Sequence, residues 1–387
     1  KAKTSALICS FLIIGQTRGT YDCSNAGLVR HERRRRTSPT SKQNAVPVMQ
    51  TAEQSVVLEN VKLTARRIFN LITTELAQVE AEFERQARSN VQVIAYLGDY
   101  LRESGGKRVR PALTILSNYS VGGDGSRYNS IRMATVMEFL HTATLVHDDI
   151  IDSADTRRSR PTVNALYGNE TAVLMGDWLY MSAFETSLTE RSLPILDILT
   201  RVTRKMTEGE LLQLTTLGRT DLSEQQYLDI IQRKTAYLFS ACCEVGAILG
   251  GASEQEQKAL GDYGMNLGMA FQLTDDLLDF TSTSDALGKG TGVDLLGGKV
   301  TLPLIYLIRS ESSARDMVQT VMSEQRYETV IRSRLLEAVD RVGAGEQART
   351  QADEYAETAR NALDELADSE YSESLRAIPT YVLNRDR

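Results

Sequence analysis

The sequence predicts an all-α protein, a multi-layer helical bundle around a central cavity, and three observations support this fold class. Only seven of the 387 residues are proline, whereas average usage of about 5% would supply roughly 19. From Thr51 onward, apolar residues recur at the three- and four-residue spacing of a helix face, and no segment alternates convincingly as a half-buried strand does. Several segments, such as 254–284, are apolar over much of a helix circumference, which indicates more than one layer.

Clusters of glycine, proline and aspartate mark where these helices end. The clearest breaks are Gly105-Gly106 and the stretches 122–125, 159–161 and 288–298. Between the breaks, the apolar spacing predicts helices over residues 53–88, 91–103, 111–121, 127–152, 170–190, 194–217, 223–250, 254–284, 301–310, 313–323, 327–342 and 345–369, with a last few turns before Asn384. No linker divides them, so we expect one domain over residues 49–387.

Residues 1–48 differ from this pattern, with nine Lys or Arg, two acidic residues and a net charge of +7. A Lys-flanked apolar stretch precedes an acid-poor tract of arginine, serine and threonine, a composition typical of a targeting presequence. Because the first methionine is Met49, the segment can equally be sequence upstream of the true start or part of a truncated precursor. A basic arm that binds nucleic acid is a further alternative. We exclude the segment from the fold and expect it to be disordered.

The remaining chain carries 35 basic and 49 acidic residues, a net charge of −14, which argues against nucleic-acid binding and favours cations. No window reaches 18 consecutive apolar residues, so we expect a protein that is soluble or peripheral to a membrane. Cys9, Cys23, Cys242 and Cys243 have neither metal-ligand spacing nor a disulfide framework, which indicates a reducing compartment. We expect the cytoplasm, or a plastid or mitochondrion if residues 1–48 are a genuine presequence.

The apolar helix over 127–152 ends in three carboxylates, Asp148, Asp149 and Asp152. A spacing of four places Asp148 and Asp152 on one helix face. At roughly 4 Å each like-charged pair would repel by about 4 kcal/mol at an effective dielectric constant near 20, so the cluster needs cations or shifted pKa values. Mg²⁺ suits it, because this ion is usually held by one or two carboxylates together with substrate phosphates. A solvated acidic helix end would show the same pattern.

A second copy of the pattern, Asp275, Asp276 and Asp279, lies 127 residues later on the apolar helix over 254–284. Solvation alone does not explain two coincident copies. Facing helices of a bundle build metal sites from inward-pointing side chains. The two motifs together therefore predict a polynuclear Mg²⁺ site across the central cavity.

Basic residues beside glycines predict anion binding. The turn Gly105-Gly106-Lys107-Arg108-Val109-Arg110-Pro111 leads into a helix whose first free N–H groups favour a phosphate, and Lys107 and Arg110 can add charge-assisted hydrogen bonds. By itself this turn can also be an exposed basic loop. Arg157 and Arg158 follow the first acidic motif. Acids, cations and glycines together suggest two diphosphates bound at once, one through metal and one directly through Arg and Lys.

At these residues the sequence resembles the trans-isoprenyl diphosphate synthases, in particular the long-chain polyprenyl diphosphate synthases that make quinone side chains. The resemblance covers roughly residues 90–387. Further matching residues are His141, the dipeptide Lys234-Thr235, Gln272, Lys289 and Lys299. Two departures, Ser159 in place of the usual glycine and the run Gly292-Val293-Asp294, affect the expected loop geometry but not the reaction.

The resemblance implies an isoprenoid synthase fold, a homodimer and a set of site residues. The implied Mg²⁺ ligands are Asp148, Asp152, Asp275, Asp276 and Asp279, with Asp149 as a further catalytic residue. The residues implied to hold isopentenyl diphosphate are Lys107, Arg110, His141 and Arg158. The residues implied to hold the allylic diphosphate are Arg157, Lys234, Thr235, Gln272, Lys289 and Lys299.

The implied reaction joins an allylic diphosphate to successive isopentenyl diphosphates. Metal and basic groups stabilise the leaving diphosphate as the allylic C–O bond ionises in a site shielded from water. The isopentenyl double bond then attacks the cation, and the proton passes to the departing diphosphate because no side chain is evidently the base.

A long product needs an open tunnel and a route of release. Ala143 lies five residues before Asp148, about 7.5 Å deeper at 1.5 Å per residue, and Ala143 and Thr144 are small enough to leave a tunnel open. Release of the product implies a peripheral contact with a membrane. The alternatives are a short-chain farnesyl or geranylgeranyl synthase, a non-catalytic partner subunit, and a terpene cyclase.

Overall fold

The computed structural model describes residues 66–88, 91, 93, 94, 96, 108–157, 160–281 and 292–384. The expectations for residues 1–48, for most of the helix over 91–103 and for Lys107, Arg158, Ser159 and Lys289 lie outside these residues. Within them the prediction of an all-α fold is confirmed. The described helices are α2 (Thr73–Gln86), α4 (Val109–Ser120), α5 (Tyr128–Ile151), α6 (Val163–Tyr167), α7 (Asn169–Leu188), α8 (Leu193–Thr216), α9 (Glu224–Ile231), a π-helical turn η1 (Gln232–Ala236), α10 (Tyr237–Gly250), α11 (Glu254–Thr281), α13 (Val293–Leu296), α14 (Leu302–Ser310), α15 (Ala314–Glu324), α16 (Arg332–Arg341), α17 (Ala344–Ala362), a 3₁₀ turn η2 (Leu363–Glu365) and α18 (Glu370–Leu383).

Several boundaries differ from the prediction. The helix expected over 223–250 is divided by the π-helical turn, and the helix expected over 327–342 begins at Arg332. Near the break predicted around 159–161, two strands of two residues each, β1 (Thr156–Arg157) and β2 (Arg160–Pro161), pair in antiparallel fashion, and α6 follows them. The last helix, α18, has 14 residues and contains Pro379, and the Ser369 side chain caps its start by accepting from the Ser372 N–H. Composition alone gave no sign of these local features.

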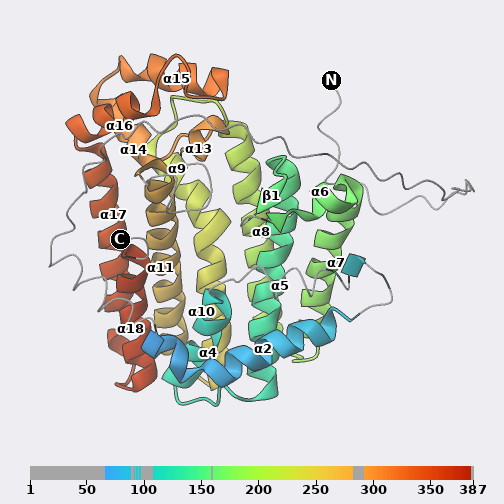
Figure 1. Cartoon of the computed structure of the whole chain (residues 1–387). Coiled ribbons are helices and arrows are strands. Elements are labelled where there is room, and N and C mark those ends of the chain that lie inside the picture. Colours follow the sequence, from blue (N-terminus) through green and yellow to red (C-terminus); the bar gives the residue numbers. More distant parts are fainter. Residues whose placement is uncertain are drawn as a thin grey trace, which may run out of the picture. The chain divides into compact units, whose positions relative to one another are not determined.

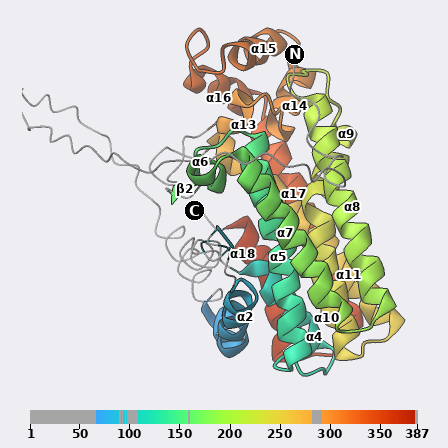
Figure 2. The same ribbon diagram turned by 90° about the vertical axis from the view of Figure 1, so that its right-hand side faces the viewer.

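The long helices run alongside one another (Figure 1). α5 packs against α7 and α4, α10 packs against α4 and α11, and α17 packs against α11. Figure 2 shows α7 and α8 side by side on another face of the bundle. α15 and α16 lie at one end of the bundle, the upper end in Figure 1, and α2 crosses the opposite end. Among the described residues no helix combines the length and apolar character needed to cross a bilayer.

Two buried apolar clusters share α11. The first gathers side chains of α2, α4, α5, α7, α8, α10 and α18, and it includes Leu260, Tyr263 and Leu267 from the first half of α11. The second gathers side chains of α13 to α17, and it includes Leu273 and Phe280 from the second half. All these residues belong to one compact unit. The second half of α11 therefore carries its acidic motif against a different core from the one behind α5.

Two cysteines of α10 belong to the first cluster. Cys242 and Cys243 are free thiols with no exposed surface, on the helix that packs closely against α4. Burial raises the pKa of Cys242 to about 12 and raises the pKa of Cys243 further.

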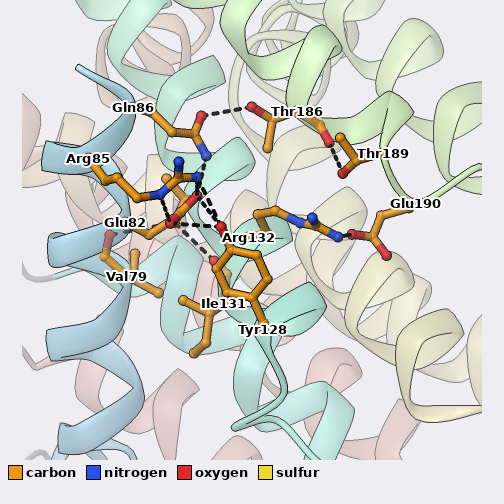
Figure 3. Close-up of polar contacts among 11 residues, drawn as sticks. Val79, Glu82, Arg85, Gln86, Tyr128, Ile131, Arg132, Thr186, Thr189 and Glu190 are labelled. Carbon is orange, nitrogen blue, oxygen red and sulfur yellow. Dashed lines mark hydrogen bonds and ion pairs between the residues drawn. The ribbon is translucent and has the colours of Figure 1, made fainter. Parts of the chain in front are cut away.

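A polar network fixes α2 to the far ends of α5 and α7 (Figure 3). The Arg85 guanidinium donates to Glu82 and, at 2.9 Å, to the Tyr128 hydroxyl of α5. Gln86 donates to Glu82 and accepts a 2.7 Å hydrogen bond from Thr186 of α7. Since Glu82 is buried, these donors satisfy a carboxylate that would otherwise be costly to bury.

Candidate active site

Both acidic motifs lie at the same end of the bundle. α5 and α11 run in the same direction, and in Figure 1 both end at its upper side, with α10 between them. α5 is buried along most of its length, and its three aspartates lie at its C-terminal end. Lys299 Nζ, in the loop after the second motif, lies 3.5 Å from the Asp152 carboxylate and 3.9 Å from the Asp294 carboxylate, so the end of α5 and this loop lie close together.

The carboxylates of the first motif each face a different cation. The Asp148 carboxylate lies 3.8 Å from Lys234 Nζ, and the Asp152 carboxylate lies 3.5 Å from Lys299 Nζ. Asp149 is buried and accepts a hydrogen bond from Arg157 Nε at 2.8 Å, and Arg157 Nη2 lies 2.7 Å from the same carboxylate oxygen as an ion pair. Lys299 and Asp152 are 147 residues apart in the chain, so the loop after the second motif reaches the first motif.

Burial is the largest of the effects that shift the pKa of Asp148. It raises the pKa of this carboxyl to about 6, although the nearby Lys234 ammonium opposes the rise. The pKa of Lys234 is raised, because the charges of Asp148 and Glu210 outweigh the lowering effect of burial. An ion pair joins Lys234 to Glu210 of α8, a residue for which the sequence predicts no role.

The second motif presents its three carboxylates differently. Asp275 is exposed, whereas Asp276 is only 7% exposed. Asp276 accepts a hydrogen bond from the Tyr227 hydroxyl at 2.5 Å and one from Gln272 Nε2 at 2.7 Å. Burial raises the pKa of Asp276 to about 8, and the neighbouring Asp294 adds to this rise.

Asp279 connects the end of α11 to the residues at the start of α13. Its carboxylate oxygens accept hydrogen bonds from the backbone N–H groups of Val293, at 3.3 Å, and Asp294, at 3.1 Å. Burial raises the pKa of Asp279, and these two backbone donors oppose the rise.

Asp294 is a further acidic residue of the site. The sequence analysis names it only as part of the run Gly292-Val293-Asp294 and assigns it no role in the site. Burial raises its pKa to about 6, with a contribution from Asp279, and Lys299 Nζ lies 3.9 Å from its carboxylate. Its position five residues before Lys299 in a glycine-rich loop is the one sequence signal that points to it.

Lys234 and Thr235 lie in the π-helical turn between α9 and α10. Such turns insert an extra residue into a helix and are frequent at functional sites. Gly209 of α8 makes room for this turn, since a Cβ atom there would lie 2.7 Å from the backbone nitrogen of Lys234. The Thr235 hydroxyl donates to Gln272 Oε1 at 2.8 Å, so the predicted residues Thr235 and Gln272 are in direct contact.

The remaining predicted residues that the structure describes lie on α4 and α5. Arg110 has its guanidinium carbon 5.0 Å from the centroid of the Phe239 ring, and its Nε is buried without a hydrogen-bond partner among the described residues. Burial lowers the pKa of Arg110. His141 is partly buried, and its carbonyl accepts a 2.7 Å hydrogen bond from the Thr144 hydroxyl. Ala143 has no exposed surface.

The donor set suits Mg²⁺ held jointly with phosphates. Within the described part of the chain, no three Asp, Glu, His or Cys side chains come close enough to hold a metal ion by themselves. Mg²⁺ keeps several waters and is usually bound through one or two carboxylates plus substrate phosphates, so pairs such as Asp148 and Asp152 are sufficient. The lysines beside these aspartates show that the region already concentrates cationic partners.

Comparison with known proteins identifies the family of the chain. The family model described as Polyprenyl synthetase matches residues 91–338. The chain is 38% identical over 325 residues to the octaprenyl diphosphate synthase of Escherichia coli strain K12, covering 84% of this chain and all of that protein.

Solved structures agree with this result. A decaprenyl diphosphate synthase from Rhodobacter capsulatus is 35% identical with a TM-score of 0.78, over 84% of this chain and 99% of that one. A polyprenyl synthase from Caulobacter crescentus, complexed with calcium and isoprenyl diphosphate, is also 35% identical with a TM-score of 0.78, over 84% of this chain and 98% of that one. The fold is that of the isoprenoid synthases, and the chain is a trans-prenyltransferase that belongs to the polyprenyl synthetase family.

Proposed function

We propose that the protein condenses an allylic diphosphate with successive isopentenyl diphosphates to a long-chain all-trans polyprenyl diphosphate, in a reaction that requires Mg²⁺. The observation that carries the proposal is the contact of Lys299 with Asp152 and of Lys234 with Asp148, which joins the surroundings of both acidic motifs in one site. The relatives described above are named as octaprenyl and decaprenyl synthases, which supports a long product. The product would then serve as a quinone side chain.

The residues present can hold two diphosphates. Lys234, Lys299 and Arg157 would contact the allylic diphosphate, and with bound Mg²⁺ they would offset the charge that develops on it as the C–O bond breaks. Arg110 supports a second anion site, because its Nε is buried without a hydrogen-bond partner among the described residues. Lys107, His141 and Arg158 complete the set proposed for isopentenyl diphosphate.

The chemistry follows from this placement. The bonding electrons leave with the allylic diphosphate, the isopentenyl double bond attacks the allylic carbon, and the proton lost afterwards passes to the departing diphosphate. Apolar side chains of α5 below the aspartates would exclude water from the cation.

Turnover with purified protein, Mg²⁺, labelled isopentenyl diphosphate and farnesyl diphosphate tests the proposal, with chromatography of the dephosphorylated products. Asp148→Ala and Asp275→Ala should each abolish most turnover while circular dichroism shows a folded protein. Asp262→Ala, which removes an exposed acid from α11 far from the motif, is the matched control and should keep turnover. Near-normal turnover of the two motif variants at saturating Mg²⁺ would refute the metal assignment, and a wild-type product of farnesyl or geranylgeranyl length would indicate a short-chain synthase.

We also propose that the protein forms a homodimer through α7 and the adjoining α8. Leu174, Met181 and Leu188 lie seven residues apart on α7 with 62%, 62% and 56% of their surface exposed. On α8, Leu193 and Leu211 are exposed as well. An apolar stripe of this kind on one face suits a two-fold contact, in which the same surface is buried on both copies. For product release we propose a peripheral contact with a membrane, since a long polyprenyl chain is poorly soluble in water.

A further inference from the structure

Arg108, directly before α4, contacts acidic residues of two other helices. Its Nη1 donates to Glu138 of α5 at 2.8 Å, and its Nε donates to Glu80 of α2 at 3.4 Å. The side chains of Arg108 and Glu138 are only 12% and 10% exposed, whereas the side chain of Glu80 is 51% exposed. Arg108 and Glu138 therefore form a buried ion pair between the start of α4 and the middle of α5, and Glu80 is an outer partner.

The backbone of Arg108 has a conformation that residues with a Cβ atom rarely adopt. Its φ is 48° and its ψ is 37°, in the left-handed region, and α4 begins at the next residue, Val109. The Arg108 carbonyl accepts from the Ala112 N–H at 3.0 Å, so this residue also belongs to the first turn of the helix. Such a conformation persists where the surrounding structure holds it. The ion pair with Glu138 is a contact that can do so.

Glu138 also lies near residues proposed for isopentenyl diphosphate. It is three residues before His141, which places both on one face of α5. Arg110 is two residues after Arg108, and burial lowers its pKa, an effect that the charge of Glu138 is among those to oppose. Among the described residues Glu138 forms its ion pair with Arg108 and not with Arg110, so the charge of Arg110 remains for an anion.

We propose that Arg108 and Glu138 are positioning residues for the isopentenyl diphosphate site, because their ion pair fixes the first turn of α4, and with it Arg110, against α5. The inference deepens the proposed function and rests on it, since Arg110 is proposed to hold this diphosphate. Arg108 acts through the backbone of α4 and does not contact the substrate. The two partners are 30 residues apart on different elements, so no local pattern in the sequence marks the pair.

Calorimetric titration of isopentenyl diphosphate into protein kept in a chelator tests the ion pair without metal or turnover. Arg108→Ala and Glu138→Ala should each raise the Kd about tenfold, and the double variant should stay within about threefold of either one, because all three lose the same link. Arg108→Lys keeps the charge and should stay within about threefold of the wild type. Loss of a negative charge near Arg110 would by itself strengthen anion binding, so weaker binding by Glu138→Ala reports lost positioning.

Glu138→Gln covers the case in which a truncated side chain destabilises the fold. It keeps the volume of the buried side chain and removes its charge, and it should raise the Kd at least about threefold. Circular dichroism and the Kd for farnesyl diphosphate, measured with Mg²⁺ and without isopentenyl diphosphate, should match the wild type for every variant of the pair. In steady-state turnover only the KM for isopentenyl diphosphate should rise.

The matched control is Glu80→Ala. It removes the exposed partner of the same guanidinium, and exposed ion pairs contribute little, so the Kd for isopentenyl diphosphate should change less than about twofold. An effect as large as that of Glu138→Ala would show that any loss of charge around Arg108 suffices, which contradicts the specific role of the buried pair.

The inference and the proposed function fail in different ways. If Glu138→Ala and Glu138→Gln leave the Kd unchanged or lower it, the positioning role is wrong. It is also wrong if the effect of the double variant equals the product of the two single effects, since Arg108 would then act independently of Glu138. If Arg110→Ala binds isopentenyl diphosphate as the wild type does, or if the wild type does not bind it without metal, the proposed diphosphate site itself is wrong.

Discussion

At the scale of single residues, Asp276 shows how burial makes a carboxylate sensitive to pH. Its pKa is raised from 3.8 to about 8, so the folded protein holds a proton there that the unfolded chain releases near pH 4. A group of this kind contributes stability that is complete below the unfolded pKa and is lost as the pH rises through the folded pKa. Asp148 and Asp294 act in the same direction but only up to about pH 6.

We therefore predict that the free energy of unfolding of the metal-free protein falls between pH 6 and pH 8, by up to about 1.4 kcal/mol per pH unit from Asp276 alone. Asp276→Asn should flatten this part of the profile, because Asn does not titrate. Urea unfolding in the presence of a chelator at several pH values measures the effect. Parallel profiles for the wild type and the variant would show that Asp276 does not titrate in this range.

A second residue-scale prediction concerns the length of the product. Ala143 is fully buried on α5, one and a half turns below Asp148, and a larger side chain there would occupy the path proposed for the growing chain. Ala143→Phe should keep turnover but shorten the main product to the farnesyl or geranylgeranyl length, at a cost in stability of about 1–3 kcal/mol from overpacking. Ala143→Ser, a change of similar volume, is the control and should keep the wild-type product. Chromatography of the dephosphorylated products decides, and an unchanged long-chain profile from a folded, active Phe variant would place the tunnel elsewhere.

At the scale of elements, the π-helical turn depends on one glycine of a neighbouring helix. A Cβ atom at Gly209 would lie 2.7 Å from Lys234 N and 2.8 Å from Arg233 Cβ, so Gly209→Ala must push α8 away from the turn. We expect a loss of stability of about 1–3 kcal/mol and a higher KM for the allylic substrate, because Lys234 moves.

Gly345→Ala in α17 is the control for this substitution. Its Cβ would meet Val339 Cγ1 at 3.6 Å, an ordinary contact, and alanine favours a helix over glycine by about 1 kcal/mol, so this variant should be slightly more stable. Thermal unfolding and steady-state kinetics measure both variants. A Gly209→Ala protein with wild-type stability and kinetics would show that the close approach is unimportant.

The elements that the sequence predicts well are those with a strong apolar period. The helices around both acidic motifs are confirmed within a few residues, since their spacing of apolar side chains has no other regular solution. The π-helical turn is not predictable in this way, because one extra residue leaves the apolar period of α9 and α10 almost unchanged. The four-residue α13 was missed for another reason: it is held by Asp279, a partner distant in the chain, rather than by its own sequence.

The candidate site likewise has a part that local sequence patterns predict and a part that they do not. Residue types at fixed spacing, such as Asp148 with Asp152, predict carboxylates on one helix face from the sequence alone. The contacts of Glu210 with Lys234 and of Tyr227 with Asp276 join residues on different helices, and no local pattern marks them. Predicting those partners requires the packing of α8, α9 and α11, which depends on the whole core.

At the scale of the whole molecule, the exposed apolar stripe of Leu174, Met181 and Leu188 on α7 is the surface through which we propose that two copies associate. Met181→Glu would place a charge at its centre, where the proposed two-fold contact brings like residues together and would not tolerate two unpaired carboxylates. We predict a shift from dimer to monomer with the helical circular dichroism retained, measured by light scattering after size-exclusion chromatography.

The control for the dimer prediction is Ile331→Glu. Ile331 is 57% exposed at the start of α16, away from α7, and its replacement should not change the mass in solution. A wild type that is monomeric at micromolar concentration, or a Met181→Glu protein that stays dimeric, would contradict the prediction.

The adjacent thiols of Cys242 and Cys243 on α10 can report how often α10 separates from α4. An alkylating reagent attacks the thiolate, and Cys242 and Cys243 are buried with raised pKa values, so they react only when α10 separates from α4. The extent of alkylation at this pair, followed by peptide mass, thus measures the population of the opened protein. A diphosphate that binds only the closed protein must slow the labelling by the factor 1 + [L]/Kd, so the affinity of each substrate can be determined separately and without any turnover.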